Sequence, residues 1–403
     1  MEQLLYIHHY GDQHATKDVR TISDGGSNIH VHLIKRLEKK FIIIISTYAE
    51  NFISKNYFSR SKRVKIIEHF TLSGLFKRNI LFTEFALRCL YPGLKYLFFP
   101  GKFTYIVSQT DFLPDVLPAL FIKLRRPRTI WVASYFLEAP KPWDKNSPYK
   151  GLRWLIGLSY WLLQRLSYLI IKSRADFVLV TSQPDVARFI TGKRDQSKVL
   201  VAQGGVDVEP SKKYLRSGKV IPLNRRKYDA VFVGRFHYQK GVLELLDIWK
   251  RVCEGMPSVR LAMIGSGPLG GEVRQKIDKL KLQKNVDLLG YLSGNDKFEI
   301  FKQSKVVVHP ATYDSGGMAA AEALAWGLPG VAFNLESLKT YYPRGVLKVK
   351  CFDNNEFAQV ICRLLKYKNL YYRMSKQALD LINESWDWKV RSQQLINQLT
   401  KSG

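Results

Sequence analysis

Short apolar runs rich in β-branched residues alternate with longer segments of helical periodicity along the whole chain. The run Phe41–Ser46 (FIIIIS) has no polar alternation, which is typical of a strand that is covered on both faces. This alternation predicts βαβ units and parallel sheets. The other strands are predicted near Leu4–His8, Val64–His69, Thr104–Ser108, Thr129–Ser134, Phe177–Thr181, Val199–Ala202, Ala230–Gly234, Arg260–Gly265, Val286–Gly290, Val306–His309 and Gly330–Asn334.

The alternation of strands and helices stops between residues 203 and 228. Helices are predicted between the strands before this point, for example at Ser27–Lys40, Asp115–Leu124 and Pro184–Ile190. Within 203–228, glycines and prolines cluster with lysines and arginines, which is typical of a linker. Because 403 residues are enough for two ordinary domains, we expect two doubly wound domains joined by this linker. Ligands of such domains bind beyond the carboxyl ends of the strands.

The charge of the chain is strongly basic. It has 63 Lys and Arg residues against 34 Asp and Glu residues, a formal net charge of +29, spread almost evenly over the two halves. Such a field attracts nucleic acid, an anionic lipid surface or a phosphorylated substrate. Nucleic acid is the least favoured of the three, because the sequence has no recognisable reading helix or RNA-binding motif.

The sequence also indicates the compartment. The four cysteines are scattered without CxxC spacing, so we expect reduced thiols rather than disulfides or a metal site. The chain opens without a basic segment before an apolar core, so no secretory signal is expected. The apolar stretch Leu152–Ile171 is interrupted by Arg153, Gln164 and Arg165, which argues against a transmembrane helix. We therefore expect a cytosolic protein that at most rests on a membrane.

The first motif with chemical content follows a predicted strand, at Val233–Phe236 (VGRF), and is completed by Lys240 and Gly241. Gly234 allows a sharp turn after the strand, and Arg235 and Lys240 then project over the strand end. An Arg fork and a Lys point charge in this arrangement suit a diphosphate. The alternative is two solvated surface cations beside a helix start.

The second motif is a glycine-rich turn at Ile264–Leu269 (IGSGPL), where a strand gives way to a helix. Helix N-termini attract anions, although a single GxGP motif such as Gly265–Pro268 is a weak signal. A dinucleotide fingerprint would instead have GxGxxG near the chain start, with an acidic residue further on. The chain start has no such motif, so an NAD site is not favoured.

The third motif spans residues 309–329 and joins an acid, two glycines and an alanine-rich helix. Gly316 and Gly317 are predicted to leave free backbone N–H groups at the helix start. Asp314 before the helix and Glu322 within it offer carboxylates that accept hydrogen bonds from sugar hydroxyls. The alternative for Glu322 is an acid that only complements the helix dipole.

Together the three motifs resemble the family 4 retaining glycosyltransferases of the GT-B fold. The resemblance covers about residues 203–345, with VGRF…KG, IGSGPL and the Asp314-to-Glu322 block ending in AWGLP in the same order and spacing. It implies an α/β GT-B architecture of two Rossmann-like doubly wound domains facing a central cleft. Residues 1–205 would bind the acceptor and residues 206–385 the nucleotide-sugar donor, and a helix at 386–403 could pack back on the N-terminal domain.

The resemblance also implies roles for individual residues. Arg235 and Lys240 would bind the donor diphosphate, Asp314 would contact the transferred sugar, and these three are the expected catalytic residues. Asp314 stands where Glu is commoner in the family, so its carboxylate lies one methylene closer to the backbone. Glu322 would hold the nucleotide ribose. The expected donor-binding residues are Gly25, Gly26, Gly234, Gly265, Gly267, Ser315, Gly316, Gly317, Met318 and Glu322.

The first half resembles the family more loosely. The segment Asp24–Asn28 (DGGSN) is similar to the glycine-rich loop after the first strand, and the alternative is an ordinary turn and helix cap. Many members carry a histidine after the strand that corresponds to Thr129–Ser134, but here Ser134 and Tyr135 stand there. No first-half catalytic histidine is therefore assigned.

The implied activity is retaining transfer of a sugar from a nucleotide-sugar to an acceptor, such as a lipid-linked saccharide or another cell-envelope glycan precursor. No metal and no other cofactor is expected, because Arg235 and Lys240 can stabilise the departing diphosphate and no DxD motif is present. A phosphorylase or a nucleotide-sugar epimerase of the same fold is the main alternative.

A membrane surface is the other expected partner. Basic and aromatic residues interleave over residues 55–78, and Trp143, Trp154 and Trp161 surround the apolar stretch at 152–171. This mixture suits an anionic membrane interface on the cytosolic side. The alternative is that the 152–171 helix belongs to the core and the cations are solvated.

Overall fold

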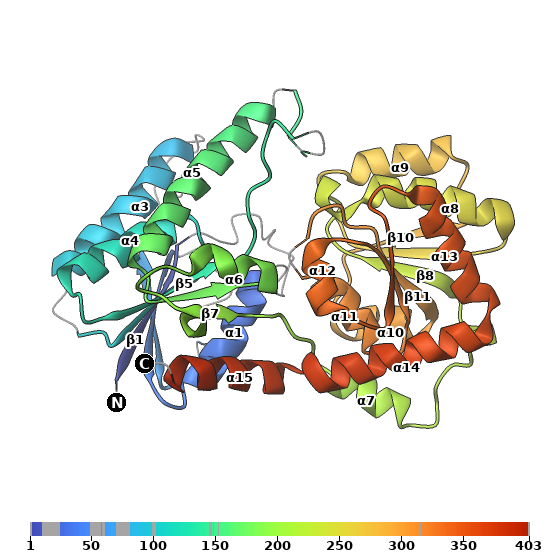
Figure 1. Cartoon of the computed structure of the whole chain (residues 1–403). Helices are drawn as coiled ribbons and strands as arrows, with labels where there is room; N and C mark the ends of the chain where they lie inside the picture. The colour runs from blue at the N-terminus through green and yellow to red at the C-terminus, as the bar shows by residue number, and fades with distance from the viewer. Residues whose placement is uncertain are drawn as a thin grey trace. The chain divides into compact units, whose positions relative to one another are not determined.

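The computed structural model describes two compact units. The described residues are 2–9, 25–48, 58, 61–69, 81–98, 102–144, 147, 149–151, 153–314 and 316–401. The first unit comprises Met1–Gly204 with Ser392–Gly403, and the second comprises Gly205–Arg391. Each unit is built on its own parallel sheet with flanking helices (Figure 1).

The sheet of the first unit has the strand order β3-β2-β1-β4-β5-β6-β7, and every neighbouring pair is parallel. The strands are β1 (Gln3–His8), β2 (Ile42–Tyr48), β3 (Val64–His69), β4 (Tyr105–Ser108), β5 (Ile130–Tyr135), β6 (Phe177–Val180) and β7 (Val199–Val201). Five of the six residues of β1 are buried, as expected for a central strand that is covered on both faces. The strand order reverses between β1 and β4.

Three helices of the first unit, α3, α4 and α5, form a layer on one face of its sheet (Figure 1). The helices described in this unit are α1 (Gly25–Leu37), α3 (Leu81–Phe98), α4 (Leu113–Arg125), α5 (Arg153–Arg174) and α6 (Gln183–Phe189), and α15 (Trp388–Lys401) ends in it. α4 contacts both α3 and α5. The contact with α3 is close, because a Cβ atom at Gly93 would lie 2.3 Å from the Phe121 ring.

The sheet of the second unit has the order β10-β9-β8-β11-β12-β13 and is also fully parallel. The strands are β8 (Tyr228–Val233), β9 (Leu261–Ile264), β10 (Val286–Gly290), β11 (Ser304–His309), β12 (Gly330–Phe333) and β13 (Val346–Val349). The helices are α7 (Glu209–Leu215), α8 (Val242–Gly255), α9 (Gly270–Lys279), α10 (Gly294–Lys302), α11 (Met318–Leu324), α12 (Glu336–Tyr341), α13 (Asn354–Lys366) and α14 (Lys368–Ser385).

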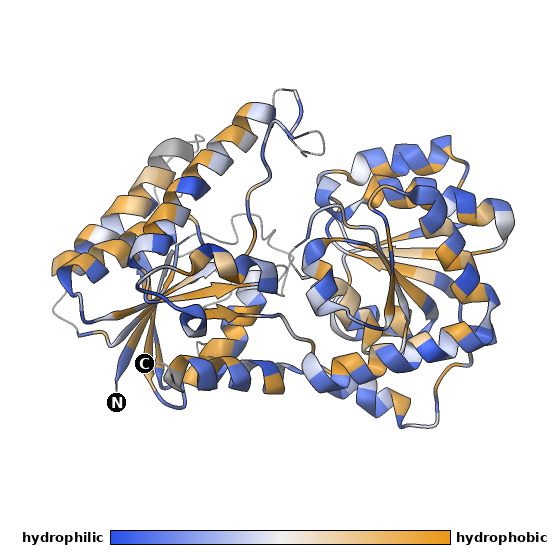
Figure 2. Ribbon diagram, in the orientation of Figure 1, coloured by the Kyte–Doolittle hydropathy of each residue, from blue (hydrophilic) through white to orange (hydrophobic). Residues whose placement is uncertain are grey.

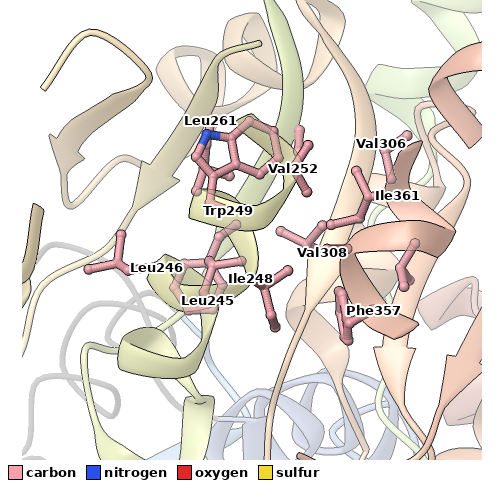
Figure 3. Close-up of a cluster of buried hydrophobic side chains, with 14 of the residues drawn as sticks. Leu245, Leu246, Ile248, Trp249, Val252, Leu261, Val306, Val308, Phe357 and Ile361 are labelled. Atoms are coloured by element: carbon pink, nitrogen blue, oxygen red, sulfur yellow. The ribbon is translucent and has the colours of Figure 1, made fainter. Parts of the chain in front are cut away.

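The core on one face of this sheet is centred on α8. Figure 3 shows side chains of α8 beside those of β9, β11 and α13; the labelled residues are Leu245, Leu246, Ile248, Trp249, Val252, Leu261, Val306, Val308, Phe357 and Ile361. Trp249 is fully buried, and its indole N–H donates to the carbonyl of Asn285 at 3.1 Å. Each such apolar side chain contributes roughly 1.5–3 kcal/mol on burial. This packing fixes the strands whose ends carry the site.

The segment 203–228, predicted as a linker, is largely folded. It contains α7, and the Val206 and Val208 side chains are buried in the second unit's core. The backbone N–H of Val206 donates to the carbonyl of Trp386 at 2.7 Å, and the Tyr214 ring lies 5.6 Å from the Trp326 ring. The linker prediction is therefore wrong over most of this segment. The prediction rested on its many glycines, prolines and basic residues and overlooked the few side chains that make these contacts.

Candidate donor-binding edge of the second sheet

The strand order of the second sheet reverses between β8 and β11. From β8 the chain continues outward to β9 and β10, and it then returns to β11 before passing outward to β12 and β13 on the other side. Sheets of this kind bind ligands beyond the carboxyl ends of the two strands at the reversal. The loops that leave these strand ends carry Arg235 and Lys240 after β8, and Asp314 after β11. Topology and sequence motifs thus point to the same edge of the sheet.

The loop after β8 is fixed on one side by the loop after β9. The Gly234 N–H donates to the Ile264 carbonyl at 3.0 Å, and the Phe236 N–H donates to the Ser266 carbonyl at 2.8 Å. Gly265 has a φ of 143°, and a Cβ atom there would lie 1.9 Å from the Gly234 carbonyl oxygen. A Cβ atom at Gly267 would likewise lie 2.6 Å from the Phe236 carbonyl oxygen. These glycines let the two loops approach closely; their direct contact with a donor remains a prediction.

The same loop is fixed on its other side by the loop after β11. The Thr312 N–H donates to the Gln239 carbonyl at 3.0 Å. Gly241 has a φ of 63°, and a Cβ atom there would lie 1.9 Å from the Pro310 carbonyl oxygen. Lys240 is therefore held beside the segment that carries Asp314.

Asp314 is the centre of this edge. Its Oδ2 lies 2.5 Å from the Lys240 ammonium nitrogen and 3.1 Å from Nε2 of His309. Its Oδ1 accepts hydrogen bonds from the N–H groups of Gly316 and Gly317 at 3.2 and 3.1 Å. Burial alone would raise the pKa of Asp314, but the Lys240 charge and the His309 hydrogen bond outweigh burial and hold that pKa well below its usual range. The carboxylate is charged, buried and fully hydrogen-bonded.

The prediction that the Gly316 and Gly317 amides are free is wrong, because both donate to Asp314. An aspartate two or three residues before a turn can accept from these amides, a local arrangement that competes with any external ligand. Gly317 has a left-handed φ of 60° and caps α11, whose first residue is Met318. Ser315 lies outside the described residues.

Arg235 and Lys240 differ in their surroundings. Lys240 forms an ion pair with Asp314, and the Lys240 side chain is 28% exposed. Arg235 is exposed, and among the described residues it has no carboxylate partner. The edge therefore presents one cation that is held in place and one that is available to an incoming anion.

Glu322, on α11, has a partner that the sequence did not indicate. Its Oε2 lies 2.7 Å from the ammonium nitrogen of Lys297 on α10, with the two side chains 33% and 16% exposed. The two residues are 25 positions apart and belong to different elements, so no local spacing links them. Lys297 orients the carboxylate that was predicted to hold a ribose.

The first sheet has a corresponding reversal between β1 and β4. Gly25 and Gly26 are the first two residues of α1, whereas Asp24 lies outside the described residues. His8 and His9 at the end of β1 are buried; burial lowers the pKa of His8 to about 4 and that of His9 well below its usual value, so both rings are neutral. Gly25 and Gly26 thus belong to the first unit, and their contact with a donor stays a prediction.

A histidine does reach the end of β5, although not from the position expected by resemblance. Nε2 of His30 on α1 lies 3.0 Å from Ser134 Oγ, and its Nδ1 lies 2.5 Å from the Tyr6 hydroxyl. Burial lowers the pKa of His30 to about 3, so this ring is neutral and structurally constrained. The sequence did not indicate this contact because residues 30 and 134 are far apart in the chain.

Comparisons with known proteins agree with this architecture. The chain is 25% identical over 166 residues to a poly(glycerol-phosphate) alpha-glucosyltransferase of Bacillus subtilis, covering 40% of this chain and 24% of that protein. It is 29% identical over 148 residues to the UDP-Gal:alpha-D-GlcNAc-diphosphoundecaprenol alpha-1,3-galactosyltransferase of Escherichia coli, covering 35% and 38%. The matches thus span less than half the length of either relative.

A solved structure resembles the whole chain. The Anabaena protein HepE, crystallised in complex with UDP-glucose, superposes with a TM-score of 0.68 and 16% identity over all of both chains. At this identity the likeness concerns the fold, which is the GT-B fold. Residues 216–380, which contain all of the edge from Arg235 to Glu322, match the family model of glycosyl transferases group 1. Over residues 216–380, the second unit is thus similar to the glycosyl transferases group 1 family.

Proposed function

We propose that the protein is a retaining glycosyltransferase that transfers a sugar from a nucleotide-sugar to a lipid-linked saccharide or another cell-envelope glycan precursor. The observation that carries this proposal is the Lys240–Asp314 pair at the strand-order reversal, beside the exposed Arg235. The names of the relatives support it, since one acts on a poly(glycerol-phosphate) and another on a diphosphoundecaprenol-linked sugar. HepE of Anabaena, which has the same fold, was crystallised with UDP-glucose, a nucleotide-sugar of the proposed donor class.

Transfer breaks the bond between the sugar and the diphosphate, so negative charge develops on the departing nucleotide. Arg235 and Lys240 would stabilise this charge from fixed positions, which is electrostatic catalysis by preorganised donors. The Lys240 ammonium has three donors, so it can keep Asp314 and still reach a phosphate oxygen. Asp314 would hold the Lys240 ammonium in place through their 2.5 Å contact. The expected contact of Asp314 with the sugar would share or replace one of the hydrogen bonds that its two oxygens accept.

The remaining roles extend this donor site. Glu322, oriented by Lys297, would accept hydrogen bonds from the ribose hydroxyls. Among the described residues, no group of three or more His, Cys, Asp or Glu side chains is arranged to hold a metal ion. Metal independence remains our expectation, and undiminished turnover after EDTA treatment is the result that agrees with it.

The first test is a transfer assay with UDP-glucose and other nucleotide-sugars in the presence of a membrane-lipid extract as the acceptor source. We expect a glycosylated lipid product whose new linkage has the same anomeric configuration as the donor, as read by NMR. A product with the inverted anomeric configuration would contradict the retaining mechanism. Sugar phosphate formed from inorganic phosphate, or epimerised nucleotide-sugar without transfer, would favour the phosphorylase or the epimerase instead.

A further inference from the structure

We propose that the outward apolar face of α5 and α3 is a membrane-docking surface that lies in the interface of an anionic phospholipid bilayer. The proposal extends the proposed function, in which the acceptor is linked to a lipid. The first unit would contact the membrane that carries this acceptor. The surface, here named the α3/α5 face, consists of large apolar side chains that the fold leaves exposed. They are Leu90, Tyr91, Leu94, Phe98, Trp154, Leu155, Ile156, Leu162, Leu163, Leu166 and Leu169.

The polarity of α5 is the reverse of that of an ordinary surface helix. Its buried residues are Gly157, Gln164, Ser167 and Ile171, so three of the four are small or polar. Its large apolar residues instead point away from the first unit, with Leu155, Ile156 and Leu169 between 60% and 64% exposed. A helix of a soluble domain normally turns its apolar stripe toward the core. Figure 2 shows this hydrophobic colouring along α5 and the neighbouring α3.

α3 extends the same surface. Phe98 is 86% exposed, and Leu90, Tyr91 and Leu94 are between 44% and 51% exposed. α3 packs on α4, and α4 packs on α5, so the exposed side chains belong to one layer of helices (Figure 1). Single exposed apolar residues are common, but a set concentrated on helices of one layer marks an interaction surface.

The charges of the same layer identify the occupant. α5 contains Arg153, Arg165, Lys172 and Arg174 and no Asp or Glu. Exposed arginines also stand at the end of α4 and just after it, at Arg125 and Arg128. Apolar side chains among cations complement a bilayer with anionic headgroups, which offers hydrocarbon and negative charge together.

A pocket beside α5 matches a lipid phosphate. It has a volume of about 470 Å³ and is lined by Glu138, Lys141, Trp143, Trp161, Arg165 and Arg188. Glu138 is paired with Arg188 at 2.7 Å, which leaves Lys141 and Arg165 without an ion pair among the described residues. The Trp143 and Trp161 rings are 5.0 Å apart, and Trp side chains favour the headgroup level of a membrane. The pocket thus places cations and indoles at the margin of the α3/α5 face.

The hydrogen bonds of Gln164 indicate that α5 lies along the membrane rather than crossing it. Among the described helices, α5 alone is long and apolar enough to span a bilayer. Its Gln164 Nε2, however, donates to Asp111 Oδ2 at 2.6 Å and to the Leu137 carbonyl at 2.7 Å. Gln164 Oε1 accepts from the Ala139 N–H at 2.5 Å. Crossing would leave these buried groups unpaired, which is costly in hydrocarbon.

The test is flotation of the full chain with vesicles made of equal parts phosphatidylcholine and phosphatidylglycerol, at low salt and without donor or acceptor. We expect the wild type to float. The triple variant Leu155→Ser, Ile156→Ser, Leu169→Ser should bind the vesicles at least about tenfold more weakly. The matched control is Tyr367→Ser, Tyr372→Ser, which removes rings that are 62% and 58% exposed in the second unit. It should float as the wild type does.

The charge contribution is tested in the same assay. Arg165→Gln should weaken binding on the order of fivefold, and high salt should weaken binding of the wild type. A wild type that does not float, or a triple variant that floats unchanged, overturns the proposal. If sedimentation shows that the triple variant instead dissociates an oligomer, the face joins copies of the chain and the proposal also falls. Because flotation uses neither donor nor acceptor, its outcome is independent of the proposed transferase activity.

Discussion

At the scale of single residues, the two cations expected at the donor diphosphate should respond differently to mutation. Lys240→Ala and Arg235→Ala should each lower turnover by roughly 30- to 1000-fold, because each removes a charged contact worth about 2–4 kcal/mol in the transition state. Lys240→Ala also leaves the buried Asp314 without its cation. Lys240→Ala should therefore lower the free energy of unfolding by about 1–3 kcal/mol. Arg235→Ala should leave that free energy unchanged, because the Arg235 side chain is exposed.

Thermal unfolding and turnover of both variants check this prediction together. Equal losses of stability in the two variants would contradict the different surroundings that the structure gives them. Near-wild-type turnover in both variants would contradict the assignment of Arg235 and Lys240 to a diphosphate site.

Glu322 and Lys297 form a second residue pair with a separable role. Glu322→Gln retains the side-chain volume but weakens acceptance from ribose hydroxyls, so the donor KM should rise roughly 10- to 100-fold. Lys297→Met should raise the donor KM less, because Lys297 acts only by orienting the carboxylate at 2.7 Å. Steady-state kinetics with varied donor decide the point. A Lys297→Met effect equal to or larger than that of Glu322→Gln would mean that the lysine itself touches the donor.

At the scale of elements, the loop after β8 depends on backbone approach rather than on side chains. Gly265→Ala would place a Cβ atom 1.9 Å from the Gly234 carbonyl oxygen, so it should displace the loop that carries Arg235 and reduce both stability and turnover. Gly271→Ala in α9 is the control, because nothing lies within 4 Å of its Cβ position. That change should be neutral or stabilising by up to about 1 kcal/mol. A harmless Gly265→Ala would show that the two loops are not held together in this way.

The anchoring of α5 predicts a pH dependence of stability. Burial raises the pKa of Asp111 from 3.8 to about 6, although the hydrogen bond from Gln164 opposes the shift. The folded state therefore holds this proton more tightly than the unfolded state. Stability should fall as the pH rises from about 4 to about 6 and then stay level. Asp111→Asn keeps an acceptor for Gln164 and should remove this fall, as measured by urea unfolding at several pH values. An unchanged pH profile in the variant would contradict a buried titrating Asp111.

Much of the element pattern was predictable because uninterrupted apolar runs identify buried parallel strands. Twelve strands lie within a few residues of their predicted positions, for example β3 and β10. β13 was missed because Val346–Val349 (VLKV) is short and contains a lysine. α7 was missed because Pro210 and basic residues dominate its sequence. Much of the basic and aromatic stretch at 55–78 lies outside the described residues; within it, Lys62, Arg63 and Lys65 are exposed.

At the scale of the whole molecule, each unit repeats one architectural rule: its sheet order reverses beside the first strand of that sheet, and residues predicted for the site follow the strands at that point. Sequence motifs pointed to the proposed donor edge because Arg235, Lys240 and Asp314 each follow a strand end closely. They could not show that Asp314 pairs with Lys240, since that pairing depends on how residues 74 positions apart approach each other. The hydrogen bonds from the Gly316 and Gly317 amides to Asp314 are local and depend on the geometry of the turn. The same limit applies to Lys297 and to His30.

The central claim is that the edge formed by the loops after β8 and β11 binds the diphosphate of a nucleotide-sugar. Calorimetric titration of UDP-glucose, followed by other nucleoside diphosphate sugars and the corresponding nucleosides without phosphate, tests it most directly. We expect at least one nucleotide-sugar to bind the wild type, its bare nucleoside to bind far more weakly, and Arg235→Ala to lose most of the affinity while unfolding at the wild-type temperature. No binding by any nucleotide-sugar, or equal affinity in the wild type and Arg235→Ala, would contradict the account.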